Sequence, residues 1–304
     1  MTLQLDQIED RELSIRHGDL ELLRYVYRPD NDQFESPRPY FEPIRDLAGQ
    51  QVSLYRPHDH VWHKGIALSL PNCGPHNFWG GRTFRRGQGY VDEKNDGSME
   101  HRSFTELESG DQGVKVAEEL EWVTQDGDHF FSEKRAFAAT VTGDDTWVLS
   151  FSTAVTNDTD QVVVMGSPTT EGRENAGYGG FFWRGPRSFT EGRVYTAAGT
   201  GGDEMMGVRG DWMGFHGKHD SNDAESTLVF TDHPENPGAP IKWFVRTTPF
   251  AAVCPAPFFD AELPMEPGRT VTLRHAVAVC NGDTGAEGAG KTAELAAAEL
   301  ARLG

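Results

Sequence analysis

The sequence has few cysteines, a deficit of positive charge and no long apolar run. Its three cysteines, Cys73, Cys254 and Cys280, lie far apart among 304 residues, so they form neither a disulfide framework nor a Cys-x-x-Cys metal knuckle. This usage favours a reduced compartment in which each thiol packs as a small apolar residue. No stretch approaches the roughly 20 apolar residues of a membrane helix, and the N-terminus lacks the basic and apolar regions of an export signal. The sequence therefore predicts a cytoplasmic protein that does not enter a membrane.

The charge balance excludes another group of partners. The chain carries 28 Lys and Arg residues against 47 Asp and Glu residues, for a formal net charge of −19. Such a polyanion is repelled by nucleic acids and by anionic membranes. A small molecule remains as the expected partner, and the sequence leaves the oligomeric state open.

Turn-forming and strand-forming residues are abundant. The 34 glycines and 17 prolines separate short segments whose apolar residues alternate by two, which is typical of a turn-rich all-β protein. The clearest candidate strands are Leu20–Tyr27, Gly113–Val123, Trp147–Val155, Gln161–Met165, Ser226–Thr231, Ile241–Arg246 and Thr270–Cys280. Their spacing favours sandwich-like sheets.

Only the end of the chain reads as a helix. Residues 290–303 are rich in Ala, Leu and Glu, with Leu295 and Leu300 expected to face the core. Asp203–Gly217 and His233–Pro240 read as long loops, and His216 and His219 are expected in an exposed loop. With no repeat and no linker, we expect a single domain over residues 1–304.

Histidines and carboxylates gather in two segments. His58, His60 and His63 lie within Pro57–Gly65, together with Asp59 and Lys64, and a second group follows in Asp232–Pro237. Imidazoles beside carboxylates serve proton transfer near neutral pH or metal ligation, and loops between rigid strands are where such groups are displayed. We therefore expect the active site at these two segments.

Six separated motifs carry a resemblance that covers most of the chain. They are Arg38–Arg45, Asp59–Ile66, Asn77–Trp79, Tyr178–Arg184, Asp232–Arg246 and Glu266–Arg274. In order and spacing they resemble an uncharacterised bacterial family labelled "methane oxygenase subunit-like". Since no membrane helix accompanies them, the resemblance implies a galactose-mutarotase-like β-supersandwich, a large two-sheet antiparallel sandwich with a short C-terminal helix.

Domains of that kind bind sugars with His, Arg, aromatic and carboxylate side chains. The resemblance therefore implies an enzyme acting by proton transfer on a sugar or an oxidised sugar derivative, through epimerisation, mutarotation, elimination or hydrolysis. His60 or His63 is the expected acid or electrophile, and Asp232 or Glu171 the expected base. The residues expected to hold the substrate are Lys64, Trp79, Arg184, His233, Asn236, Tyr178 and Arg38.

Three other readings remain open. In the first reading the protein is a noncatalytic sugar-binding or regulatory module. In the second the histidines are structural loop residues, and in the third the site binds a divalent metal for hydrolysis or oxygenation. In the metal reading the ligands come from His58, His60, His63 and His233, a set that suits zinc, manganese or non-haem iron. Covalent acyl chemistry is not expected, because no Gly-x-Ser-x-Gly motif is present.

Overall fold

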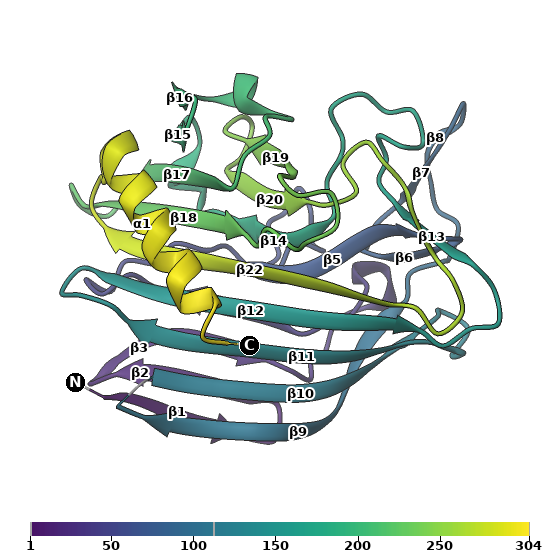
Figure 1. The fold of residues 1–304 in the computed structure, drawn as a ribbon, viewed down its shortest axis with the longest axis horizontal. Helices are drawn as coiled ribbons and strands as arrows, with labels where there is room; N and C mark the ends of the chain where they lie inside the picture. The colour runs from purple at the N-terminus through teal and green to yellow at the C-terminus, as the bar shows by residue number, and fades with distance from the viewer. Residues whose placement is uncertain (1, 112, 304) are drawn as a thin grey trace.

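Two large antiparallel sheets lie face to face in the computed structural model, which describes residues 2–111 and 113–303. In Figure 1 the nine-stranded sheet lies in front of the eleven-stranded sheet. This arrangement confirms the prediction of a large all-β sandwich with a C-terminal helix. The expected strands are present, because their alternating apolar residues have a core to cover on at least one side.

The first sheet has eleven strands. Its main path runs β1 (Leu3–Ile8), β2 (Glu12–His17), β3 (Leu20–Val26), β4 (Tyr40–Ile44), β5 (Ile66–Cys73), β14 (Gly180–Arg184), β20 (Ala252–Ala256) and β19 (Lys242–Arg246). Beside this path, β6 (His76–Phe78) and β13 (Val163–Gly166) pair with β5, and β21 (Leu263–Met265) pairs with β13.

The second sheet has nine strands. Their order is β16 (Gly199–Gly201), β15 (Arg193–Thr196), β17 (Trp212–Lys218), β18 (Glu225–Asp232), β22 (Thr270–Asn281), β12 (Thr146–Asn157), β11 (His129–Val141), β10 (Gly113–Val123) and β9 (Ser98–Gly110). The smaller elements are the hairpin β7 (Thr83–Arg85) with β8 (Gly89–Val91), and the 3₁₀ turns η1 (Gln33–Glu35), η2 (Arg187–Phe189) and η3 (Asp203–Met205).

The main core lies between the sheets, but both sheets also carry apolar side chains on their outer faces. On β14, Phe181 and Trp183 belong to the main core, whereas Phe182 belongs to a separate aromatic cluster. Because successive side chains of a strand point to opposite faces, Phe182 lies on the face turned away from the second sheet. That outer face is where the candidate site forms.

The outer face of the second sheet is covered by the helix α1 (Gly285–Leu300), which crosses β18, β22 and β12 diagonally in Figure 1. Its small residues Ala289, Ala293 and Ala296, followed by Leu300, pack on Val148, Val229, Ala276, Ala278 and Cys280. The helix begins before the predicted 290–303 range and leaves Leu295 exposed, contrary to the expectation that it faces the core.

The sequence interpretation of residues 203–217 is wrong. This segment contains η3 and most of β17, and His216 is a buried residue of that strand rather than part of an exposed loop. Gly214 and Gly217 obscure the strand pattern, because glycine is uncommon inside strands. Here the missing side chains leave room for Tyr195 and Phe189, respectively. No helix among the described residues is long and apolar enough to cross a membrane.

Candidate active site

A pocket of about 740 Å³ opens on the outer face of the first sheet, over β14 and β19. His60 and His63 line it, as do Phe182 from β14 and Phe244 from β19. Its walls are mainly aromatic, formed by Phe34, Trp62, Trp79, Tyr90, Tyr178, Phe182, Phe244 and Phe250. A concave, largely apolar site with a few polar groups is the usual form of a small-molecule site.

The loop that carries the histidines is fixed by close backbone contacts. Gly65, with φ +59°, donates its N–H to the carbonyl of Leu54 at 3.0 Å and accepts the N–H of Arg184 at 2.7 Å. Arg38 is buried, and its guanidinium donates to the carbonyl oxygen of Trp62 at 2.7 Å and to Ser69 Oγ at 2.7 Å. Arg38 therefore positions the loop instead of reaching the pocket.

The two histidines of this loop lie against each other. The rings of His60 and His63 stack with centroids 4.7 Å apart and planes inclined by 11°. His63 is 3% exposed and contacts Phe182, while His60 is more exposed and contacts Phe250. The pair thus presents two imidazoles side by side on one wall of the pocket.

Hydrogen bonds give the two rings opposite tautomers. A guanidinium has only donors, so Nδ1 of His63, 3.0 Å from Arg184 Nη1, accepts a hydrogen bond and the proton is on Nε2. A carboxylate only accepts, so Nδ1 of His60 donates to Asp59 Oδ2 at 2.9 Å and its Nε2 keeps a lone pair. Arg184 completes the chain by donating to both Asp59 oxygens at 3.1 and 3.0 Å.

The surroundings keep both rings neutral. Burial lowers the pKa of His60, and the hydrogen bond to Asp59 offsets this only in part. Burial and the neighbouring positive charges, including that of Arg184, hold the pKa of His63 well below its usual value. Burial alone raises the pKa of Asp59, but the hydrogen bonds from His60 and Arg184 outweigh it, so the pKa is lowered and the carboxylate stays ionised.

Of the residues expected to hold the substrate, Trp79 and Tyr178 line the pocket. Trp79 is held by Asn77, whose Oδ1 accepts the backbone N–H of Trp79 at 2.8 Å and that of Gly80 at 3.1 Å. The rings of Trp79 and Tyr178 lie 4.6 Å apart. Tyr178 also shares a hydrogen bond of 2.8 Å with the hydroxyl of Tyr90 from β8.

Lys64 lies outside the pocket, although it follows His63 directly. Its side chain is 1% exposed, forms an ion pair with the buried Glu35, and donates to the carbonyl of Val61 at 2.9 Å. Arg56 is the second cation on Glu35. The expected substrate contact from Lys64 is therefore not made from this position.

The Asp232–Pro237 segment is also separate from the pocket. Asn236 donates to Asp232 Oδ1 at 2.6 Å and to the carbonyl of Arg274 at 2.7 Å, which ties this loop to β22. Nδ1 of His233 accepts the N–H of Glu235 at 3.2 Å. The expectation that Asp232, His233 and Asn236 join His60 and His63 is not met, because the segment follows a strand of the other sheet.

Three further expected residues, Arg184, Glu171 and His58, do not line the pocket. Arg184 instead bonds to His63 and Asp59. Glu171 lies in the same loop as Arg173 and Asn175, which do line it, and His58 is exposed. Sequence reasoning assigned no role to Asp59, Phe182, Phe244 or Phe250. For Phe182 a signal exists: β14 is apolar on both faces, and a continuous apolar run predicts a strand covered on both sides.

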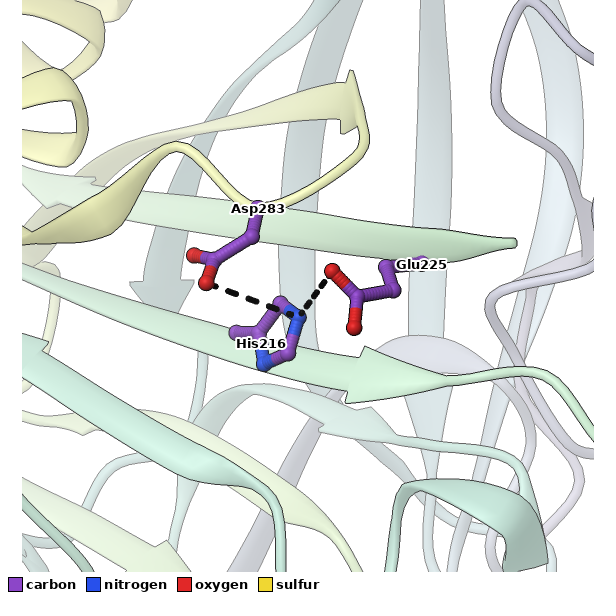
Figure 2. A group of neighbouring side chains, drawn as sticks. All are labelled: His216, Glu225 and Asp283. Atoms are coloured by element: carbon purple, nitrogen blue, oxygen red, sulfur yellow. Dashed lines mark ion pairs between the residues drawn. The ribbon is translucent and has the colours of Figure 1, made fainter. Parts of the chain in front are cut away.

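The predicted metal ligands do not converge, and histidine and carboxylates meet elsewhere. Within the described chain, His216 of β17 lies between Glu225 of β18 and Asp283, as Figure 2 shows, with Nε2 3.5 and 4.0 Å from their oxygens. Each carboxylate already has a cationic partner: Lys218 lies 3.1 Å from Glu225, and Arg193 lies 2.7 Å from Asp283. We therefore assign this group as an ion-pair cluster that ties strands together.

Sequence comparison identifies a family for nearly the whole chain. A model described as "Family of unknown function (DUF6807)" matches residues 12–294. No curated protein matches the chain. These comparisons do not confirm the resemblance to the family labelled "methane oxygenase subunit-like".

Structural comparison finds larger proteins that contain a similar arrangement. One is the GH36 alpha-galactosidase AgaA of Geobacillus stearothermophilus in complex with raffinose, at 10% identity and a TM-score of 0.44, covering 93% of this chain and 42% of that one. Another is the heparan sulfate lyase HepC of Pedobacter heparinus, at 8% identity and a TM-score of 0.40, covering 92% and 35%. The chain spans less than half the length of each.

Proposed function

The chain belongs to the DUF6807 family, and we propose that it is an enzyme that transfers a proton on a sugar or an oxidised sugar derivative. The observation that carries the proposal is the stacked pair of His60 and His63 on the wall of an aromatic pocket, with one ring poised to accept a proton and the other to donate a hydrogen bond. Adjacent groups with opposite capacities are what proton transfer between neighbouring substrate atoms requires.

His60 is the base in this proposal. Its Nε2 lone pair takes a proton from the substrate, and Asp59 stabilises the imidazolium that forms, as carboxylates do for catalytic histidines. The role expected for Asp232 or Glu171 thus passes to His60, because neither carboxylate lines the pocket.

His63 is the electrophile. Its neutral Nε2–H donates a hydrogen bond to the substrate oxygen that gains negative charge when the proton leaves, and Arg184 fixes the tautomer that makes this possible. In an epimerisation, the proton on His60 returns to the same carbon after the intermediate has turned its opposite face to the imidazole. In a mutarotation, the proton moves to the ring oxygen as its bond to the anomeric carbon breaks, and the ring then recloses on either face. In an elimination, the proton goes to the leaving-group oxygen as its bond to carbon breaks. Atoms and charge balance without another reactant.

The aromatic walls support a sugar as the substrate. Trp79 and Tyr178 are aromatic and carry a polar end, and such rings pack against the apolar face of a sugar while their polar atoms reach its hydroxyls. These walls also favour the second candidate function, a noncatalytic sugar-binding module, since they do not depend on the histidine pair.

Metal-dependent chemistry receives less support from this geometry. Of the four expected ligands, His58 is exposed and outside the pocket, His233 is bonded within its own loop, and Nδ1 of His63 is occupied by Arg184. The positive charge of Arg184 beside the histidines also disfavours a divalent cation there.

Proton NMR with aldoses, uronates and keto-glycosides tests the proposal, by reading saturation transfer and anomer or product exchange in the same tube. We expect accelerated exchange or a new product with the native protein. His60→Gln and Asp59→Asn should each lower this rate by about 10²- to 10⁴-fold while saturation transfer persists. His58→Gln, from the same loop but outside the pocket, is the matched control and should keep the native rate.

Each other outcome points to a different reading. Saturation transfer without turnover in the native protein would favour the binding module. Equal turnover in His60→Gln and His58→Gln would remove His60 from the chemistry. Silence across the whole panel, with the fold verified by circular dichroism, would contradict a carbohydrate site.

A further inference from the structure

The charge of the pocket is opposite to that of the protein. Acidic residues outnumber basic ones by 47 to 28 in the chain, yet no aspartate or glutamate is among the described residues that line the pocket. Three arginines do line it, Arg82, Arg173 and Arg246. They come from three separate segments, the turn before β7, the loop before β14 and the end of β19, so their convergence is a property of the fold.

The three pocket arginines have no ion-pair partner among the described residues. Within the described chain, no carboxylate lies within 4.0 Å of any of the three, whereas Arg24, Arg85 and Arg102 form such ion pairs. Arg173 donates to the hydroxyl of Tyr90 and lies over its ring, and Arg246 lies over the ring of Phe244. The aromatic contacts hold both guanidinium groups at the pocket without neutralising them.

Asp92 is paired with Lys94 at 3.0 Å, and the hydrogen bond from Lys94, with a smaller contribution from Arg82, lowers the pKa of Asp92. Asp59, which is bonded to His60, is paired with Arg184. The pocket is therefore a concave site with uncompensated positive charge in an acidic protein. Such a site raises the local concentration of an anion and repels cations.

We propose that the ligand is an anionic carbohydrate, whose carboxylate, sulfate or phosphate group is bound by Arg82, Arg173 and Arg246. A neutral sugar gains little from a guanidinium, whereas an oxyanion is bound by two parallel N–H groups with charge assistance. The inference rests on the proposed function for the sugar ring and adds the charged substituent.

Titration calorimetry with matched sugars tests it, using glucose, galactose and mannose beside their uronates, 6-phosphates and 6-sulfates. We expect the best anionic sugar to bind at least about 10-fold more tightly than its neutral counterpart, and the preference to shrink with added salt. Arg173→Gln and Arg246→Gln should each weaken anionic binding by about 10- to 100-fold and reduce the preference for the anionic sugar over its neutral counterpart. Arg11→Gln, an exposed arginine far from the pocket, should change neither.

The outcomes separate this inference from the function on which it rests. Equal affinity for charged and neutral sugars, or no effect of either arginine variant, would overturn the anionic ligand and leave the sugar site standing. Binding of inorganic phosphate or sulfate that is lost in Arg246→Gln, with no sugar bound at all, would retain the anion site and contradict the carbohydrate. Among the anionic sugars, the one that binds best identifies the substituent.

Discussion

At the scale of single residues, neighbouring side chains of the loop before β5 point to different parts of the molecule. His63 points into the pocket, and Lys64 points to the buried carboxylate of Glu35. Both are charged or polar residues in one motif, and nothing local in the sequence distinguishes them. The distinction is made by η1, which brings Glu35 beneath the loop from nearly thirty residues upstream.

Lys64→Met should lower the free energy of unfolding by about 3 kcal/mol, because it leaves Glu35 buried with one fewer cation. Urea denaturation measures this. Arg56→Met, at the half-exposed partner of the same carboxylate, is the comparison and should cost about 1 kcal/mol or less. If Lys64→Met instead weakened ligand binding at unchanged stability, Lys64 would belong to the ligand site after all.

At the scale of elements, the alternation of apolar residues along the strands predicted the structure better than the residue patterns of the loops did. β10, β12, β18 and β22 were identifiable because one or both faces meet a core. Which segments meet at the pocket could not be predicted from the sequence. The segments β14, β19 and the histidine loop are brought together only by the order of strands in the sheet. The same order places the Asp232–Pro237 segment at the end of a strand of the other sheet, so two similar-looking motifs do not meet.

The histidine loop also depends on one close crossing of the backbone. A Cβ on Gly65 would lie 2.3 Å from the carbonyl oxygen of Phe41 and 2.7 Å from Glu42 Oε2, at a φ of +59°. No side chain fits there without a shift of the backbone that carries His60 and His63.

Gly65→Ala should therefore destabilise the protein by about 2–3 kcal/mol and also reduce turnover, because the loop must move. Gly268→Ala is the matched control: its φ is +74° but nothing lies within 4 Å of the added Cβ, so only about 1 kcal/mol of backbone strain is expected. Thermal unfolding and the exchange assay measure the two effects. Equal losses in both variants would mean that the crossing adds nothing to the strain.

At the scale of the whole molecule, buried titratable groups set the pH range of stability. Burial lowers the pKa of five histidines, His60, His63, His76, His216 and His219. Burial also raises the pKa of two carboxyls, Glu42 and Asp96, to about 7. The usual pKa of a histidine in the unfolded chain is 6.5. Below this pH the unfolded state binds protons that the buried histidines of the folded state do not bind, so stability falls as the pH falls.

The carboxyls act in the opposite direction. Each contributes stability while protonated in the fold, and loses this contribution as the pH rises through about 7. Because five histidines outweigh two carboxyls on the acid side, the free energy of unfolding should fall from about pH 7 to about pH 5. Urea titrations at the two pH values check this. Glu42→Gln should steepen the fall, because its protonated carboxyl no longer opposes the histidines; a shallower fall in that variant would contradict the assignment.

The three cysteines each occupy a different layer of the molecule. Cys73 belongs to the core between the sheets, Cys254 to the aromatic cluster beneath the pocket, and Cys280 to the surface under α1. Burial raises the pKa of all three thiols, to about 12 for Cys254 and about 11 for Cys280. An alkylating reagent can therefore modify each thiol only when its own layer opens. Mass spectrometry of labelling time courses would thus give three separate opening rates. The rate at Cys280 reports detachment of the helix, the rate at Cys254 reports opening of the aromatic cluster beneath the pocket, and the rate at Cys73 reports separation of the two sheets.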